Sequence, residues 1–415
     1  MQAQKLPVSD RAHHSTEPDA AISEWLASDA QLAVAELDIA VLDSLAPLEA
    51  VWRALDRDNL NSLQQGYDWC MAWTKAFGHQ LSIVWGRIGG ETAFILPLEI
   101  TSFHGFRTAR FIGADHSNIN TGLFSTRFIE LADNLEPQKL AMSLRRALAG
   151  RTDLLLLQNV PLEWRGRRNP LALLPMVQNQ NHAYQLPLLD KMESTLQQVN
   201  AKGRRKRFRA QLRRFEALGG FDYISSGTPD EQHQLLDRFF EQKRERLKAL
   251  GSPDVFADPE TKAFLHGAID IRDRDRDRGM VGLEMHAIRL KGEHDGRIAA
   301  LAGLSRKGDH IICQFTAFDE SAAPETSPGE FLFWQMVAGQ HGKGVRLFDF
   351  GLGDQRYKRS WAPVETEHHD VVLPLSLRGT VGAAMHRAIT RGKGFIKSQR
   401  KLYPVAQRLR RVIGV

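Results

Sequence analysis

The sequence has few cysteines, no long apolar runs and, over two of its segments, no acidic residues. Cys70 and Cys313 are the only cysteines among 415 residues. Two cysteines exclude a disulfide framework and a cysteine-based zinc site, and they are typical of a reducing compartment. Residues 1–20 lack the apolar region of a secretory signal, and no run of about 18 apolar residues could span a membrane. We therefore expect a cytoplasmic protein that needs no metal.

Acidic residues are missing from residues 202–214 and 371–415, which carry eight and ten lysines and arginines. The two segments sum to +18, so the remainder of a chain with net charge +6 carries −12 (6 − 18). The basic pI therefore does not indicate a nucleic-acid surface over the whole protein. The C-terminal basic residues predict a helix packed on the body or, through residues 386–415, peripheral contact with an anionic inner membrane.

The length and the 42% apolar fraction indicate a globular protein of two domains. Both halves show helices, a β-meander, a helix and a further strand, in that order. This pattern predicts an α/β (α+β) fold with two domains of similar topology, each with a mixed sheet flanked by helices. We expect a flexible leader, an N-terminal domain, a C-terminal domain and a basic tail at residues 1–30, 31–190, 191–378 and 379–415.

Residues 327–361 contain the most informative pattern of the chain. Ser327 is a good N-cap, Pro328 suits the first helical position, and Glu330 is placed to complete a capping box. An apolar helix follows, and then a strand that includes Asp349 and ends in a glycine-rich turn. Small residues in the first helical turn leave backbone N–H groups accessible to an anion such as a phosphate. The alternative interpretation is a capped core helix that leads into an interior strand.

Seven segments, in their order and spacing, resemble the CelD-like acetyltransferases, a branch of the GNAT superfamily associated with bacterial exopolysaccharide and cellulose synthesis. They are SLQQGYDWCMAWTKAFG (62–78), AFILPLEI (93–100), FIGADHSNINTGL (111–123), KGRRKRFRAQLRRFEALGG (202–220), FFEQKRERLKALG (239–251), SPGEFLFWQM (327–336) and FDFGLGDQRYKRSW (348–361). The resemblance covers residues 32–375. It implies two tandem GNAT folds, as in the related Fem peptidyltransferases, with the acyl donor on the second.

The resemblance also implies that acetyl-CoA or another acyl-CoA binds with its pyrophosphate at the start of the 327–361 helix. The cofactor-binding residues would be Ser327, Gly329, Glu330 and Phe331. The strand at residues 310–318 would precede this helix and offer a free N–H as an oxyanion hole. The chain departs from the family pattern here, because AAPETSPG replaces the usual Q/R-x-x-G-x-G/A loop.

Acyl transfer needs a base for the attacking group and a proton for the leaving thiolate. The candidate catalytic residues are Asp349, Asp319 and Tyr357. Partial burial would raise the pKa of Asp349 and suit it as the base, while the alternative is that it caps the glycine turn. Tyr357 either protonates the thiolate or packs in the core. Asp319 is the next candidate for the base.

Four further residues are candidates for substrate binding: Asp115, His116, Asp354 and Lys358. Asp115 and His116 lie in a polar loop of the first half, where they would line the acceptor site. Asp354 is also considered as a base. Lys358 would hold an anionic group of donor or acceptor, or it would be a surface lysine paired with an aspartate.

These observations predict an acyltransferase that moves an acyl group from acyl-CoA to an amine or hydroxyl of a saccharide or lipid-linked saccharide. A Fem-like aminoacyltransferase is the first alternative. It would use aminoacyl-tRNA, with the arginines of residues 204–214 on RNA phosphates. A non-catalytic binding module is the second alternative, and it would show no affinity for the donor.

Overall fold

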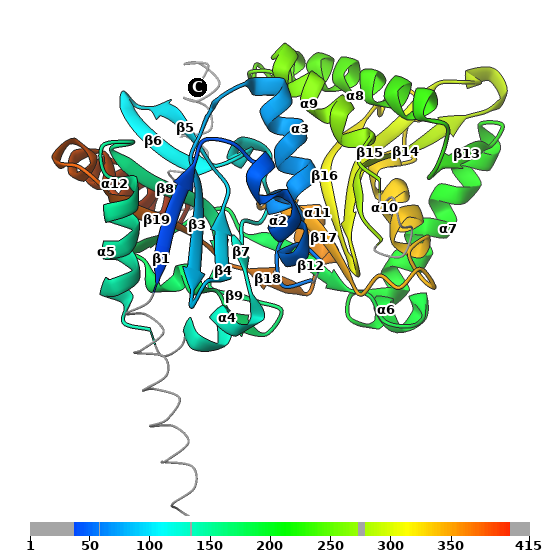
Figure 1. Ribbon diagram of the computed structural model, residues 1–415. Coiled ribbons are helices and arrows are strands. Elements are labelled where there is room, and N and C mark those ends of the chain that lie inside the picture. The colour runs from blue at the N-terminus through cyan, green and yellow to red at the C-terminus, as the bar shows by residue number, and fades with distance from the viewer. Residues whose placement is uncertain (1–36, 58, 133–134, 273–278, 399–415) are drawn as a thin grey trace, which may run out of the picture.

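The computed structural model describes residues 37–57, 59–132, 135–272 and 279–398 (Figure 1). The expected leader and residues 399–415 of the expected tail lie outside this description. Helices and mixed sheets alternate along the chain, which confirms the α/β prediction. Among the described residues, no helix combines the length and apolar character needed to cross a bilayer.

The helices and strands fall into two groups along the chain. The first half contains β1 (Asp38–Leu42), α2 (Glu49–Leu55), α3 (Tyr67–Phe77), β2 (Gln80–Leu81), β3 (Ile83–Ile88), β4 (Glu91–Leu96), β5 (Leu98–Phe103), β6 (Phe106–Phe111), β7 (Leu123–Phe124), α4 (Thr126–Ala132), α5 (Pro137–Leu148), β8 (Leu154–Pro161), β9 (Glu163–Trp164), β10 (Arg167–Arg168), β11 (Met176–Gln178) and β12 (Ala183–Pro187). The second half contains α6 (Met192–Gln197), α7 (Ala201–Ala217), β13 (Phe221–Ile224), α8 (Pro229–Ala249), α9 (Pro259–Ile269), β14 (Val281–Leu290), β15 (Ile298–Lys307), β16 (His310–Phe318), α10 (Pro328–Ala338), β17 (Leu347–Leu352), α11 (Arg356–Trp361), β18 (Val364–Thr366), β19 (His368–Pro374) and α12 (Leu377–Ser398).

The first half forms a four-stranded sheet in the order β1-β3-β4-β7 and most of a six-stranded sheet. The Gly89-Gly90 pair between two strand-like segments predicts a hairpin, and β3 and β4 form it with positive φ at both glycines. The sequence pattern predicts one strand over residues 91–100, but the structure divides it. β4 ends before Pro97, and β5 continues in the other sheet. Proline lacks the N–H that an inner strand would need, so it suits this change of sheet.

The second half forms a seven-stranded sheet in the order β13-β14-β15-β16-β17-β12-β18. β13 to β16 are antiparallel neighbours, whereas β16 and β17 are parallel and are connected through α10. Side chains alternate along the central strands between two apolar clusters. One cluster contains residues of α8 and α9, and the other contains residues of α7 and α10. These helix pairs therefore cover opposite faces of the sheet, as alternation along a strand requires.

Each half contributes a strand to the sheet of the other half. β12, from the end of the first half, lies between β17 and β18 in the seven-stranded sheet. β19, near the end of the chain, lies between β11 and β8 in the six-stranded sheet. The division into domains near residue 190 stays a prediction, because neither of these sheets is made from one continuous stretch of chain.

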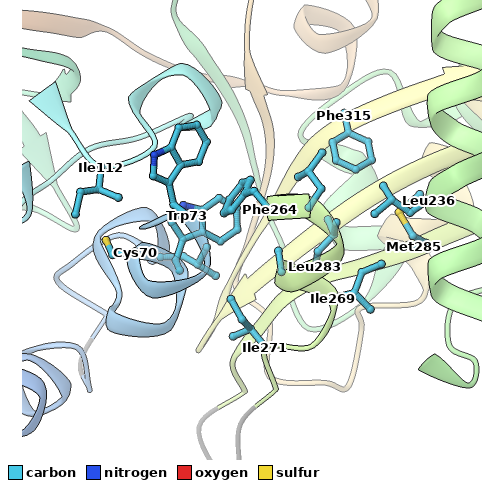
Figure 2. Packing of buried hydrophobic residues seen from close by; sticks show 14 of the residues in the cluster. Cys70, Trp73, Ile112, Leu236, Phe264, Ile269, Ile271, Leu283, Met285 and Phe315 are labelled. Atoms are coloured by element: carbon cyan, nitrogen blue, oxygen red, sulfur yellow. The ribbon is translucent and has the colours of Figure 1, made fainter. Parts of the chain in front are cut away.

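A shared apolar core joins the two halves where α3 packs against α9 (Figure 2). The ring of Phe264 on α9 lies 4.9 Å from that of Trp73 and 5.0 Å from that of Trp69, both on α3. Leu283 of β14 and Phe315 of β16 belong to the same cluster. Aromatic rings bury large apolar areas, so this contact stabilises the arrangement of the two halves.

Polar contacts also connect the halves. The Lys307 Nζ atom lies 2.6 Å from an Asp56 carboxylate oxygen, and both side chains are largely buried. The Arg165 guanidinium donates two hydrogen bonds to Asp309, which also accepts one from Asn59. A buried ion pair fixes orientation because losing either partner leaves an uncompensated charge.

Candidate active site

β16 and β17 run parallel for only three residue pairs and then separate. The pairs are His310–Leu347, Ile311–Phe348 and Ile312–Asp349. Beyond them β16 continues to Phe318 beside β15, whereas the last residues of β17 pair with β12. Backbone groups on the facing edges no longer bond to each other after the strands separate, so they need other partners.

The start of α10 differs from the predicted capping box. Ser327 is the N-cap residue, but it has a left-handed conformation (φ 51°) and its side chain caps no helix N–H. Its carbonyl accepts from the N–H groups of Glu330 and Phe331. Since Pro328 has no N–H, the amides of Ser327 and Gly329 remain for an anion, and neither donates to a backbone carbonyl of the described residues.

The side chains of Glu330 and Phe331 face away from any anion at these amides. The Glu330 carboxylate lies 3.5 Å from Arg204 and 3.4 Å from Arg207, both on α7. The Phe331 ring is fully buried and stacks on Phe208 of α7 at 5.2 Å. These contacts anchor the helix, so only the backbone of this turn is left to serve the predicted cofactor role.

Gly329 lies against the ring of Phe318, the last residue of β16. A Cβ atom at this position would approach that ring to 3.1 Å. The Arg246 guanidinium of α8 also lies over the Phe318 ring, 3.9 Å from its centroid. An exposed positive charge is therefore close to the α10 N-terminus, where the helix dipole already favours anions.

Asp349 is completely buried and has partners within the protein on each oxygen. Its carboxylate accepts from the Gln185 side chain at 2.8 Å and from the Gly351 N–H at 2.6 Å. The His310 Nε2 atom lies 3.6 Å away. Burial alone would raise the pKa of Asp349, but the His310 imidazole, the Gln185 amide and the Gly351 N–H outweigh burial and lower it. The expectation of a raised pKa is wrong, and the predicted contact with the glycine turn is present.

Two lysines are hydrogen-bonded to the strands where these separate. Lys243 of α8 donates to the Thr316 carbonyl on β16 at 3.2 Å, and Lys358 of α11 donates to the Leu352 carbonyl on β17 at 2.5 Å. Burial lowers the pKa of both ammonium groups. No carboxylate of the described residues lies within salt-bridge distance of either lysine, so Lys358 is not the surface lysine of the alternative interpretation. Lys358 is buried and Lys243 is half-buried, and a buried lysine without a carboxylate is uncommon and favours an anionic ligand.

Tyr357 and Cys313 lie beside these lysines. The Tyr357 ring stacks on Phe333 of α10 with centroids 5.0 Å apart, and burial raises the pKa of its hydroxyl. Cys313 of β16 is buried, and burial raises the pKa of its thiol to about 12. Tyr357 thus remains a proton donor at neutral pH, and the protonated thiol of Cys313 is not suited to nucleophilic attack.

Asp319 and Asp354 are both engaged in ion pairs. Asp319 lies 2.8 Å from Arg297 and accepts from the Ser321 hydroxyl and N–H, which together lower its pKa despite burial. Asp354 pairs with Arg359 and Lys397 and accepts from the Tyr184 hydroxyl, and its pKa is lowered in the same way. These partners make both carboxylates weak bases, although their predicted roles are not tested directly.

The polar loop of the first half contacts the seven-stranded sheet through Asn118, and not through the predicted residues Asp115 and His116. Its side chain donates to Gln314 of β16 at 2.7 Å and accepts from the Leu352 N–H of β17 at 3.1 Å. Asp115 instead pairs with Arg110, and the His116 ring packs near Trp73. Burial lowers the pKa of His116. Asn118 therefore bridges the two separating strands, and acceptor binding by Asp115 and His116 stays a prediction.

Sequence reasoning missed the residues that meet at this point from distant parts of the chain. They are Asn118, Gln185, Lys243, Arg246 and His310. The only available signal was on α8, where Lys243 follows Phe239 by four residues and so shares its inward face. Gln185 gave no signal, because its place beside Asp349 depends on the exchange of β12 between sheets.

Comparison with known proteins assigns the class of the second half. Residues 202–359 match the family model described as an acetyltransferase (GNAT) domain. This segment contains β16, α10, β17 and both lysines. Residues 202–359 are therefore similar to GNAT acetyltransferase domains, whereas the CelD-like branch stays a prediction. A search of curated proteins finds no match.

Solved structures share the fold over most of the chain. FemX is 12% identical with a TM-score of 0.52, over 77% of this chain and 95% of its own. A C-terminal domain described as that of a lysylphosphatidylglycerol synthetase from Agrobacterium fabrum is 12% identical with a TM-score of 0.50, over 83% of this chain and 96% of its own. These similarities extend across both halves and confirm the predicted fold class of two GNAT-like units.

Proposed function

We propose that the protein transfers an acyl group from an acyl-CoA to an amine or hydroxyl of a saccharide, such as a lipid-linked cell-envelope or exopolysaccharide precursor. The main support is the convergence of Lys243 and Lys358, without carboxylate partners among the described residues, where β16 and β17 separate. The GNAT match over residues 202–359 gives the reaction class. The choice of a saccharide acceptor rests on the CelD-like resemblance.

The α10 N-terminus fits the phosphates of an acyl-CoA. The amides of Ser327 and Gly329 are available, and Arg246 brings a positive charge from α8. Gly329 has no side chain, which lets the Phe318 ring pack closely against the first turn of α10. Three elements would thus hold the donor: the first turn of α10, the end of β16 and α8.

The remaining residues are suited to the charges that develop during acyl transfer. The C–S bond of the thioester breaks, a C–N or C–O bond forms, and the acceptor proton is finally carried by the leaving sulfur. The ammonium group of Lys358 would stabilise negative charge on the acyl oxygen, and Lys243 would add to that field. The Tyr357 hydroxyl would supply a proton to the thiolate.

Asp349 has a different role in this proposal from that of a freely accessible base. Its carboxylate is saturated by Gln185, His310 and the Gly351 N–H, so we propose that it positions the end of β17. Lys358 becomes a candidate for the base in the fraction of molecules where it is neutral, because burial lowers its pKa. Alternatively, an acceptor amine could bind already neutral.

Titration with acetyl-CoA tests the donor site through Arg246. Arg246→Gln removes the charge beside α10 and should raise the dissociation constant about 5- to 20-fold, equivalent to about 1–2 kcal/mol. A larger side chain in place of Gly329 should also raise the dissociation constant for acetyl-CoA. Isothermal titration calorimetry measures the affinity, and release of free thiol on adding saccharide acceptors measures transfer.

Arg244→Gln is the matched control, because Arg244 is exposed on the same helix but lies 3.8 Å from Asp254. Equal affinity of the wild type and Arg246→Gln would contradict the proposed phosphate contact. An absence of any acetyl-CoA affinity would contradict an acyl-CoA donor and leave the binding-module or tRNA-dependent alternative.

The Fem-like alternative is supported by the surface of α7 and by the shared fold with FemX. The exposed basic residues on this helix that have no carboxylate partner among the described residues are Lys202, Lys206, Arg209, Arg213 and Arg214, the last of which donates to the Glu325 backbone carbonyl. Such a row could follow an RNA backbone. An affinity for aminoacyl-tRNA that falls steeply with salt, together with no affinity for acetyl-CoA, would favour this alternative.

A further inference from the structure

Helix α12 packs with one face on the six-stranded sheet of the first half. Residues buried on that face include Gly379, Ala383, His386 and Thr390. His386 bonds to the buried carboxylate of Asp370 on β19 at 3.0 Å. The helix is therefore fixed in rotation, which determines which of its residues face outward.

The opposite face of α12 is apolar and exposed. Leu377, Val381, Ala384 and Ala388 follow one another at spacings of four, three and four residues, so they form one stripe along the helix. Leu377 is 92% exposed and Val381 is 63% exposed. Ile389 lies at the border of the stripe and is 38% exposed. Single exposed apolar side chains are common, but Leu377 belongs to a continuous apolar row, and such a row indicates an interaction surface.

The charges beside this stripe all have the same sign. Arg378 and Arg391 are exposed beside the stripe, and no carboxylate of the described residues lies within 4 Å of either guanidinium. Acidic residues are absent from the sequence of the whole helix. The nearby Asp153 and Asp370 are on the packed side, where they bond to Ser376 and His386.

We propose that this face of α12 binds the surface of an anionic phospholipid bilayer. An anionic bilayer fits this face because the apolar stripe can enter the boundary of the acyl chains while the cations beside it attract lipid phosphates. A second copy of the chain would place two stripes together but would also bring two sets of unpaired positive charges close to each other.

Membrane binding through this face would also place the candidate active site near lipid. Lys397, close to the end of α12, lies 3.4 Å from Asp354 and donates to the Gln180 carbonyl. Asp354 follows β17 directly and precedes α11, which carries Lys358. Lys397 is seven residues after the buried Thr390 and so shares the packed face, which places this loop about one helix diameter, roughly 10 Å, from a bilayer bound to the stripe.

Vesicle co-sedimentation of the full chain tests this proposal. The wild type should bind vesicles containing phosphatidylglycerol and should not bind pure phosphatidylcholine vesicles. The double variant Leu377→Asp/Val381→Asp should lower the partition coefficient at least about tenfold, because it removes the two largest apolar groups of the stripe and adds negative charge. Val255→Asp is the control, since Val255 is 60% exposed on the other half of the molecule.

A second pair of variants tests the role of charge. Arg378→Gln/Arg391→Gln should weaken binding to the vesicles several-fold, whereas Lys206→Gln/Arg209→Gln on α7 should leave it unchanged. The proposal would be overturned if the α7 double variant lost as much vesicle binding as the α12 charge variant, or if Leu377→Asp/Val381→Asp lost none. A concentration-dependent doubling of mass that Leu377→Asp/Val381→Asp abolishes, with no vesicle binding by the wild type, would show instead that the stripe joins two copies.

Discussion

Buried titratable side chains surround Asp349, and their neutral or charged state follows from their surroundings. His310 lies beside the carboxylate, and His368 of β19 is completely buried close to the same group. Burial lowers the pKa of His368 to about 4, so its imidazole is neutral in the folded protein at physiological pH. Between about pH 4 and pH 6.5 the imidazole is mostly neutral in the folded protein and mostly charged after unfolding.

His368 should therefore make the fold less stable in mild acid. The unfolded side chain takes up a proton near pH 6.5, whereas the folded one does so near pH 4. As the pH is lowered from 6.5 to 4, protonation of His368 in the unfolded chain should therefore lower the free energy of unfolding by about 1.4 kcal/mol for each pH unit. Urea unfolding of the wild type and His368→Leu at several pH values measures the difference between them. A difference that does not change with pH would contradict the assigned cause.

Strand β17 is the element that brings the site together, and its end depends on one glycine. Gly351 has φ of +72°, and a Cβ atom there would meet the Asn118 Oδ1 atom and the Cys313 carbonyl oxygen at 2.9 Å each. The position joins the loop of the first half to both separating strands. The glycine thus allows three segments to approach each other closely where β16 and β17 diverge.

Gly351→Ala should cost much more stability than an alanine at another glycine with similar backbone angles. Gly342 has φ of +79°, but a Cβ atom added there would have no neighbouring atom within 4 Å among the described residues. We expect Gly342→Ala to cost about 1 kcal/mol from backbone strain alone, and Gly351→Ala about 1–3 kcal/mol more from crowding. Denaturant unfolding gives both values. Similar losses at the two positions would show that the crowding is readily relieved.

At the scale of the whole molecule, strands, core residues and ion pairs all cross between the two halves, so we expect the halves to unfold together. β12 and β19 are exchanged, α3 packs on α9, and Lys307 is buried against Asp56. Burial raises the pKa of Asp56, while the Lys307 ammonium opposes that rise. A lysine removed from this position would leave the carboxylate without its compensating charge.

Lys307→Met should lower the stability of both halves together, by about 3 kcal/mol. Hydrogen exchange measured by mass spectrometry on peptides from β8 and from β15 should show the same loss of protection, since the six- and seven-stranded sheets each contain a strand from the other half. The double variant Lys307→Met/Asp56→Leu should recover most of the loss. Faster exchange in β15 alone would mean that the halves unfold separately.

The sequence predicted the fold class and the order of elements because both follow from local periodicity and turn residues. The hairpin at Gly89 and Gly90 and the N-cap position of Ser327 are examples. It could not show that Gln185 contacts Asp349, since β12 joins the second sheet through long-range pairing. The predicted direction of the pKa shift of Asp349 was wrong for the same reason, because His310 and Gln185, which lower this pKa, are distant in sequence.

The exchange of β19 has a consequence for the order in which the protein is synthesised. The six-stranded sheet places β8 and β11 early in the chain, and the strand that lies between them comes at residues 368–374. A ribosome must therefore translate the chain as far as residue 374 before the six-stranded sheet can be completed. Until then the partner edges of β8 and β11 are open, so the nascent chain exposes apolar strand edges that chaperones recognise.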